Sequence, residues 1–160
     1  MTDKMKLEQA RSVFDIICRA LDKNNIRYDK DTGALSIEFG VQGSDLIENI
    51  KISVDVQRRL VLLISHIPFT VQDDKRIDVA VAVAAINGWL VHGSFDYDVI
   101  SGTIFFRMTN SYIESYIDEE VYEYMLFCAF STVDEYNDKL LMISKGNLAI
   151  EQFLSELSQS

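Results

Sequence analysis

The sequence predicts an α+β fold in which an antiparallel sheet made of hairpins packs against helices, as in secretion chaperones. Three observations predict it: an amphipathic helical pattern at the N-terminus, a series of short segments rich in β-branched residues joined by turns, and two helical patterns at the end. Runs of strands and runs of helices are typical of α+β folds. The expected order is helix, four strands, helix, two strands, helix, helix, in a single domain over residues 1–160.

Composition and charge limit the classes of function. The chain has 160 residues, 48% of them hydrophobic, enough for one domain that buries about 70% of the surface of its unfolded chain. It has 25 acidic and 15 basic side chains, and the net charge of -10 disfavours nucleic acid as a partner. The sequence has no signal-peptide pattern and no apolar window of about 18 residues, so we expect a cytoplasmic protein that contacts no membrane.

The first helix is expected from Met5 to Lys23, where apolar residues recur at helical spacing. The following segment, IRYDKDTGALSIEFGV, is typical of a hairpin that turns at DKDTG. This turn has two carboxylates like those of a calcium loop. However, Gly33 and Gly40 stand where further oxygen ligands belong, which favours the hairpin.

A second hairpin is expected in NIKISVDVQRRLVLLISHIPF, with a three-residue turn over 56–58. This turn places Asp55 opposite Arg59, so the two charges favour the pairing. In this register Ile50, Ile52 and Val54 share a face with Leu60, Leu62 and Ile64. Val61 and Leu63 then fall on the outer face, where we expect an interaction surface.

The second helix is expected in QDDKRIDVAVAVAAINGWL, which has no polar residue from Val79 to Ile86. Such a helix should be enclosed by the sheet on one side and by another helix or a second subunit on the other. The remaining helices are expected from Asp118 to Lys145, with Gly146 ending or bending the first of them, and in NLAIEQFLSEL.

The last hairpin, DYDVISGTIFFRM, is expected to turn at Ser101 and Gly102. The expected pairs are Val99 with Ile104, Tyr97 with Phe106, Phe95 with Met108, and Asp96 with Arg107. Phe105 points outward in this register and lies opposite Asp98, so both are candidate contact residues.

No pattern in the chain favours a catalytic residue, a cofactor site or a metal site. Neither histidine, His66 or His92, has a partner at metal-ligand spacing, and Cys18 and Cys128 lie in apolar helical patterns typical of inert core thiols. Asp96 and Asp98 share a strand face and offer the only carboxylate pair for acid–base chemistry, but the expected Arg107 partner favours a structural role.

The stretch AAINGWLVHGSFDYD, followed by GTIFFRM and by a long helix with STVDEYNDKLL, resembles the YbjN-like family of bacterial proteins, labelled sensory transduction regulators. The resemblance spans Leu7 to Leu141. The positions that match the family pattern are Asn87, Gly93, Phe95 and Asp98, and Gly88 and Trp89 lie next to Asn87 in the same structural motif. It implies a secretion-chaperone-like fold that dimerises, and a non-enzymatic interaction domain. We expect Trp89 to fill the space beneath this corner, so that Trp89→Ala costs roughly 3 to 5 kcal/mol against about 1 for the hydrogen bond of Asn87.

The leading hypothesis is a homodimeric, chaperone-like module that holds a segment of another protein, basic or amphipathic in character, on Val61, Leu63, Asp98 and Phe105. The alternative is a sensor that binds a small molecule between the sheet and the last helices. Its pocket would be lined by Tyr122, Tyr124, Phe127 and Trp89.

Overall fold

The computed structural model describes residues 2–44, 46–115 and 117–159. Its helices are α1 (Asp3–Lys23), α2 (Arg76–Trp89), which follows the short 3₁₀ helix η1 (Asp73–Lys75), α3 (Glu119–Ser144) and α4 (Ile150–Leu157). Its strands are β1 (Asp29–Asp31), β2 (Ser36–Gln42), β3 (Ile47–Asp55), β4 (Leu60–Thr70), β5 (Ser94–Asp98) and β6 (Thr103–Ser111). The α+β class and the order of elements expected from the sequence are confirmed.

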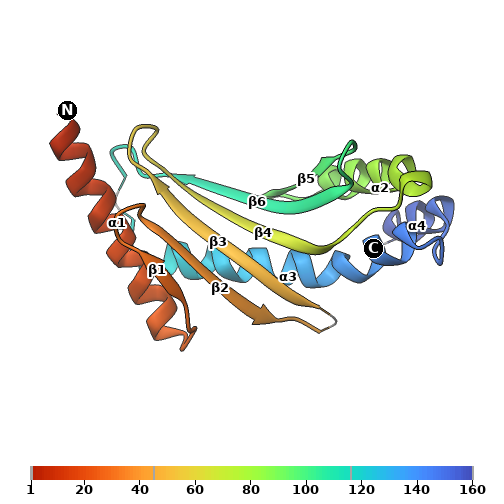
Figure 1. The fold of residues 1–160 in the computed structure, drawn as a ribbon, viewed down its shortest axis with the longest axis horizontal. Coiled ribbons are helices and arrows are strands. Elements are labelled where there is room, and N and C mark those ends of the chain that lie inside the picture. Colours follow the sequence, from red (N-terminus) through yellow and green to blue (C-terminus); the bar gives the residue numbers. More distant parts are fainter. Residues whose placement is uncertain (1, 45, 116, 160) are drawn as a thin grey trace.

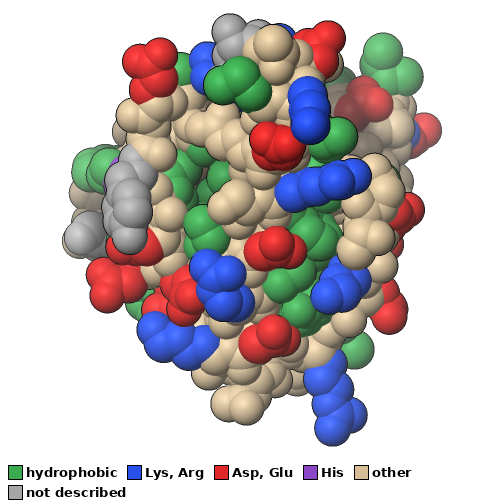
Figure 2. Space-filling model, turned by 90° about the vertical axis from the view of Figure 1, so that its left-hand side faces the viewer, with side chains coloured by type: hydrophobic (Ala, Val, Ile, Leu, Met, Phe, Trp, Pro, Cys, Tyr) green, Lys and Arg blue, Asp and Glu red, His purple; other side chains and the backbone are tan. Residues whose placement is uncertain are grey.

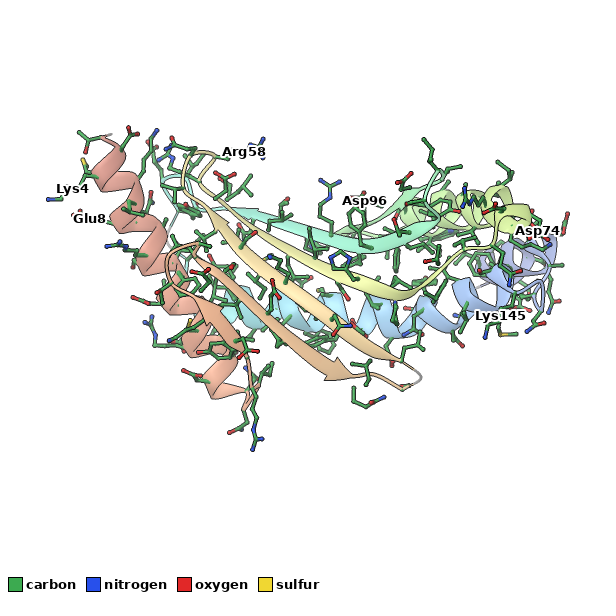
Figure 3. All side chains as sticks on the ribbon, viewed as in Figure 1. Lys4, Glu8, Arg58, Asp74, Asp96 and Lys145 are labelled. Atoms are coloured by element: carbon green, nitrogen blue, oxygen red, sulfur yellow. The ribbon has the colours of Figure 1, made fainter. Side chains whose placement is uncertain are left out.

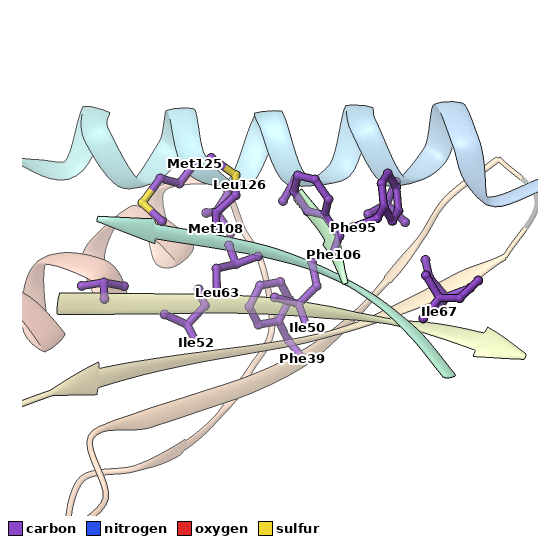
Figure 4. Packing of buried hydrophobic residues seen from close by; sticks show 14 of the residues in the cluster. Phe39, Ile50, Ile52, Leu63, Ile67, Phe95, Phe106, Met108, Met125 and Leu126 are labelled. Carbon is purple, nitrogen blue, oxygen red and sulfur yellow. The ribbon is translucent and has the colours of Figure 1, made fainter. Parts of the chain in front are cut away.

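The strands form one antiparallel sheet in the order β1-β2-β3-β4-β6-β5. The long helix α3 runs behind the sheet, α1 lies at one end, and α2 and α4 lie at the other (Figure 1). The core lies between the strands and α3, where Leu63, Phe106 and Met108 meet Met125 and Leu126 of the helix (Figure 4). The side chains of β3 and β4 are alternately buried and more exposed, which leaves one sheet face open.

Helix α1 is joined to the start of α3 by ion pairs. Arg19 Nε lies 2.7 Å from Glu119 Oε1, and Lys23 Nζ lies 2.9 Å from Glu123 Oε1. Acidic and basic side chains are mixed over this end of the molecule, as Figure 2 shows. In the described part of the chain, no helix is both long and apolar enough to cross a membrane.

The turn between β3 and β4 is one residue longer than expected, and this corrects the predicted faces of β4. Asp55 pairs with Leu60, and Arg59 adopts a positive φ of 53°. The carboxylate of Asp55 accepts a hydrogen bond of 2.8 Å from the backbone N–H of Arg58, which projects at the tip of the turn (Figure 3). Because side chains alternate along a strand, the extra residue reverses every side chain of β4.

Val61 and Leu63 are therefore core residues, and their placement on the outer face was wrong. Their exposed fractions are 0% and 1%, and they lie opposite Val54 and Ile52. The open face instead receives Leu62 and Ile64, both half-buried.

The hairpin of β5 and β6 also differs from its predicted register, by two residues. Its turn spans 99–102, so that Asp98 pairs with Thr103 and Phe95 with Phe106. A shift of two residues keeps each side chain on its face, and Phe95 and Phe106 are both buried. The ion pair between Asp96 and Arg107 still forms across the open face, with Arg107 Nε 2.6 Å from Asp96 Oδ2.

Candidate protein-interaction surfaces

The corner between α2 and β5 depends on the side-chain amide of Asn87. Its Nδ2 donates to the carbonyl of Phe95, its Oδ1 accepts from the N–H of Phe95, and both hydrogen bonds are 2.8 Å long. Phe95 belongs to the last strand of the sheet, so the amide occupies the position that a neighbouring strand would take. The buried ring of Phe95 packs against Phe106 and Tyr136, with centroids 5.1 and 6.2 Å away.

Glycine is required at position 93 in this corner. Gly93 has a φ of +73°, and a Cβ there would lie 2.3 Å from Cζ of Phe106 and 2.8 Å from Cγ of Met108. At position 88, in contrast, an added Cβ would meet nothing within 4 Å, because α2 continues through Gly88 with open space beside it.

Trp89 lies on the surface, which corrects the prediction that it fills the space beneath the corner. It is the last residue of α2, and 63% of it is exposed. The chain leaves the helix at Leu90, whose extended backbone turns toward β5.

Helix α2 is buried on one side only, which corrects the expectation of an enclosed helix. Val79, Ala82, Val83 and Ile86 are buried. The opposite side carries Ile77, Val81, Ala84 and Gly88 at spacings of four, three and four residues. We call these four residues the α2 surface, together with the exposed Trp89, which lies about 100° around the helix from Gly88 at its C-terminal end. Ile77 is 68% exposed and Val81 is 43% exposed.

The exposed turn of β5 and β6 is hydrogen-bonded to the start of α2 and carries a further exposed apolar residue. Arg76 of α2 donates a hydrogen bond to the carbonyl of Ile100 in that turn, and the Ile100 side chain is 86% exposed. Several large apolar residues are thus exposed at this end of the molecule, where α2 and the turn meet. Large exposed apolar areas mark interaction sites in globular proteins.

The open sheet face has a half-buried apolar strip. Leu62 and Ile64 of β4 lie on the same face as Phe105 of β6. Phe105 pairs with His66, with ring centroids 6.1 Å apart, so Ile64 is its diagonal neighbour and Leu62 lies two residues further along β4. We call Leu62, Ile64 and Phe105 the sheet strip.

The sheet strip is flanked by two ion pairs on the same open face. One joins Lys51 to Glu38 at 2.6 Å, and the other joins Arg107 to Asp96, which is labelled in Figure 3.

Asp98 does not lie opposite Phe105, as the sequence had predicted, because Phe105 pairs with Asp96. The carboxylate of Asp98 instead holds the turn, accepting from the N–H of Ile100 at 2.9 Å and from Ser101 Oγ at 2.7 Å. These hydrogen bonds keep the pKa of Asp98 below its ordinary value. Asp96 is engaged with Arg107, so neither carboxylate of the pair is arranged for acid–base chemistry.

A groove of about 480 Å³ lies between α3 and the end of β2, and sequence reasoning did not find it. We call it the α3 groove, and its lining residues are Val41, Gln42, Gly43, Ser44, Glu48, Phe127, Phe130, Ser131 and Asp134. One signal was available in the sequence. Glu48 precedes Ile50, Ile52 and Val54 in the same alternation, which puts a carboxylate on the buried face of β3.

Two carboxylates meet in the α3 groove. Asp134 accepts hydrogen bonds from the N–H of Ser44 at 2.6 Å and from its Oγ at 2.7 Å, which lower the pKa of Asp134. Glu48 is only 2% exposed, and Ser65 Oγ donates to its Oε2 at 3.4 Å. Burial, together with the negative charge of Asp134, raises the pKa of Glu48 to about 7.

The predicted small-molecule pocket does not form from the four residues proposed for it. Tyr122 is buried, whereas Tyr124, Phe127 and Trp89 are exposed at the surface, and only Phe127 of the four lines the α3 groove. Among the described residues there is no group of three His, Cys, Asp or Glu side chains placed to hold a metal ion. Burial raises the pKa of the Cys18 thiol, which disfavours its reactive thiolate.

Comparison with known proteins gives a likeness of fold. No family model and no curated protein matches the chain. YbjN from E. coli, described as a candidate transcription regulator, superposes with a TM-score of 0.55 at 11% identity, over 84% of this chain and 90% of YbjN.

Two complexes give similar values. The HopA1–SchA chaperone–effector complex has a TM-score of 0.54 at 9% identity over 78% of this chain and 91% of the matched chain. The ExsC–ExsE complex has a TM-score of 0.52 at 9% identity over 81% and 93%. At these identities the shared feature is the fold, and the chain has the YbjN-like, secretion-chaperone-like fold that its sequence resembles.

Proposed function

We propose that the chain is a non-enzymatic, chaperone-like module that acts in the cytoplasm as a homodimer and holds a segment of another protein. The α2 surface is the observation that carries this proposal. It exposes Ile77, Val81 and Trp89 on a chain whose net charge is -10. Contact with another protein explains why such large apolar side chains are exposed. The likeness to a chaperone–effector complex supports the same role.

The α2 surface suits a second copy of the chain. Its apolar residues recur at helical spacing, and the small side chains of Ala84 and Gly88 let another helix approach closely. A twofold dimer uses the same surface on both subunits, so one patch is sufficient. The sheet strip then stays available for the partner segment, and the acidic chain favours a basic or amphipathic one.

The dimer is tested by light scattering at micromolar concentration. We expect the wild-type mass to be twice that of one chain, and Val81→Glu to give a monomer because it places a charge in the centre of the interface. The control is Met5→Glu, at a residue 53% exposed on α1, at the other end of the molecule (Figure 1). A monomeric wild type would contradict the homodimer, and a dimeric Val81→Glu variant would contradict the α2 surface as its interface.

Binding of a partner is tested by affinity capture from the native cell with mass spectrometry. Phe105→Glu should lose proteins that the wild type retains, because it places a charge in the sheet strip. Ser111→Glu is the matched control, since Ser111 is exposed on the same strand and the same face, six residues from Phe105, and pairs with Leu60, which is not part of the strip. Equal capture by the wild type and both variants would contradict the role of the sheet strip.

A further inference from the structure

The α3 groove contains a negative charge that no cation of the described chain compensates. None of the ion pairs among the described residues involves Glu48 or Asp134. A buried carboxylate ordinarily has a cation or several hydrogen-bond donors. Only 2% of Glu48 is exposed, yet within the described residues it has a single hydrogen-bond donor, the Ser65 hydroxyl at 3.4 Å.

The loop after β2 holds Asp134 beside Glu48. Both carboxylate oxygens of Asp134 accept hydrogen bonds from Ser44, and this close approach depends on Gly43. A Cβ at position 43 would lie 2.8 Å from Asp134 Oδ1 and 3.4 Å from Glu48 Oε1. Asp134 Oδ1 and Glu48 Oε1 therefore lie near the same point beside Gly43, and both residues line the groove.

The wall of the groove is aromatic. Phe127 is 68% exposed, and Phe130 packs edge-on against the core residue Phe39 with ring centroids 6.4 Å apart. An aromatic face next to carboxylates suits a cation carried on an aliphatic stem, because the ring attracts the cation and also covers the methylene groups.

We propose that the α3 groove binds a lysine or arginine side chain carried by a segment of a partner protein. The cationic end lies between Glu48 and Asp134, and the aliphatic stem lies against Phe127. Charge complementarity assigns the occupant, since a neutral or anionic side chain would leave the carboxylates uncompensated. The assignment to a protein segment rests on the proposed function, whereas the preference for a cation rests on the groove itself.

Two synthetic peptides test the proposal. Both are seven-residue sequences of leucine and alanine around one central residue, which is arginine in one and its neutral isostere citrulline in the other. We expect the wild type to bind the arginine peptide at least tenfold more tightly by fluorescence titration at pH 8. This preference should fall about tenfold from pH 8 to pH 6, because Glu48, with a pKa of about 7, becomes protonated.

Variants connect the preference to the groove. Glu48→Gln and Asp134→Asn should each reduce it, and Glu38→Gln, on the open face and paired with Lys51, should leave it unchanged. Phe127→Ala is a second test, and it should weaken the binding of both peptides. Because the ring is exposed, this variant should fold like the wild type.

Equal binding of the arginine and citrulline peptides, or a preference that persists in Glu48→Gln and Asp134→Asn, would overturn the proposal. The outcome is separable from that of the capture experiment. Peptide discrimination without any captured protein would overturn the assignment to a partner segment and leave a site for small cations. A captured partner without peptide discrimination would overturn the groove and leave the proposed function standing.

Discussion

Replacement of Asn87 by alanine tests whether one side chain joins α2 to the edge of the sheet. The change removes two hydrogen bonds of 2.8 Å and leaves the N–H and the carbonyl of Phe95 without their partner. A backbone group that loses its partner costs about 1 to 3 kcal/mol, and the corner is partly open to water, so we expect a total of about 2 to 4 kcal/mol. Urea unfolding monitored by circular dichroism measures this loss.

Two further variants make this measurement decisive. Asn87→Asp keeps an acceptor for the Phe95 N–H but has no donor for the Phe95 carbonyl, so its loss should approach that of alanine. Trp89→Ala, two residues further on, removes a ring that is 63% exposed and should cost less than about 1 kcal/mol. This order is the reverse of the sequence-based expectation. A loss at Trp89 equal to or larger than that at Asn87 would refute the description of the corner.

Three other predictions concern the core and the α3 groove. Gly93→Ala should cost more than about 3 kcal/mol in the same urea assay, because its Cβ would lie 2.3 Å from the Phe106 ring and its φ is +73°. Leu63→Ala should lower the free energy of unfolding by about 2 to 5 kcal/mol. A loss below about 1 kcal/mol would mean that Leu63 lies on the outer face of the sheet. In the folded state the pKa of Glu48 is raised from its ordinary value of 4.5 to about 7, so Glu48 stays protonated up to a pH of about 7. The free energy of unfolding should therefore fall as pH rises from about 4.5 to about 7, by up to about 3 kcal/mol, and Glu48→Gln should flatten this dependence in a urea titration at several pH values.

The class and order of the elements could be predicted because periodicity alone distinguishes the helices from the strands. The register of β4 could not be predicted in this way. Its residues Val61 to Ile64 are apolar on both faces, so hydrophobicity does not say which face is buried. The turn length depends on the hydrogen bond from Arg58 to Asp55 and on the positive φ of Arg59, a non-glycine residue that gives no turn signal in the sequence.

The positions of Trp89 and Glu48 depended on where an element ends, which is the least reliable part of sequence interpretation. Trp89 follows the buried Ile86 by three residues, so helical spacing alone places it on the buried side. It is exposed because it is the last residue of α2, where the chain leaves the helix at Leu90. Strand β3 begins at Ile47, earlier than the alternation of isoleucines suggests, so Glu48 becomes an inward position. The α3 groove also depends on residues far apart in the chain, Ser44 and Asp134, whose contact no local pattern encodes.

The edges of the sheet bear on how the proposed partner segment would bind. A strand added to an edge needs unpaired backbone groups over several residues. At one edge β1 has three residues, all exposed and all charged, which is a short and poorly apolar template. At the other edge the amide of Asn87 already occupies the N–H and the carbonyl of Phe95. Strand addition is disfavoured at both edges, so a partner would have to be recognised by side chains. This requirement favours the α2 surface, the sheet strip and the α3 groove.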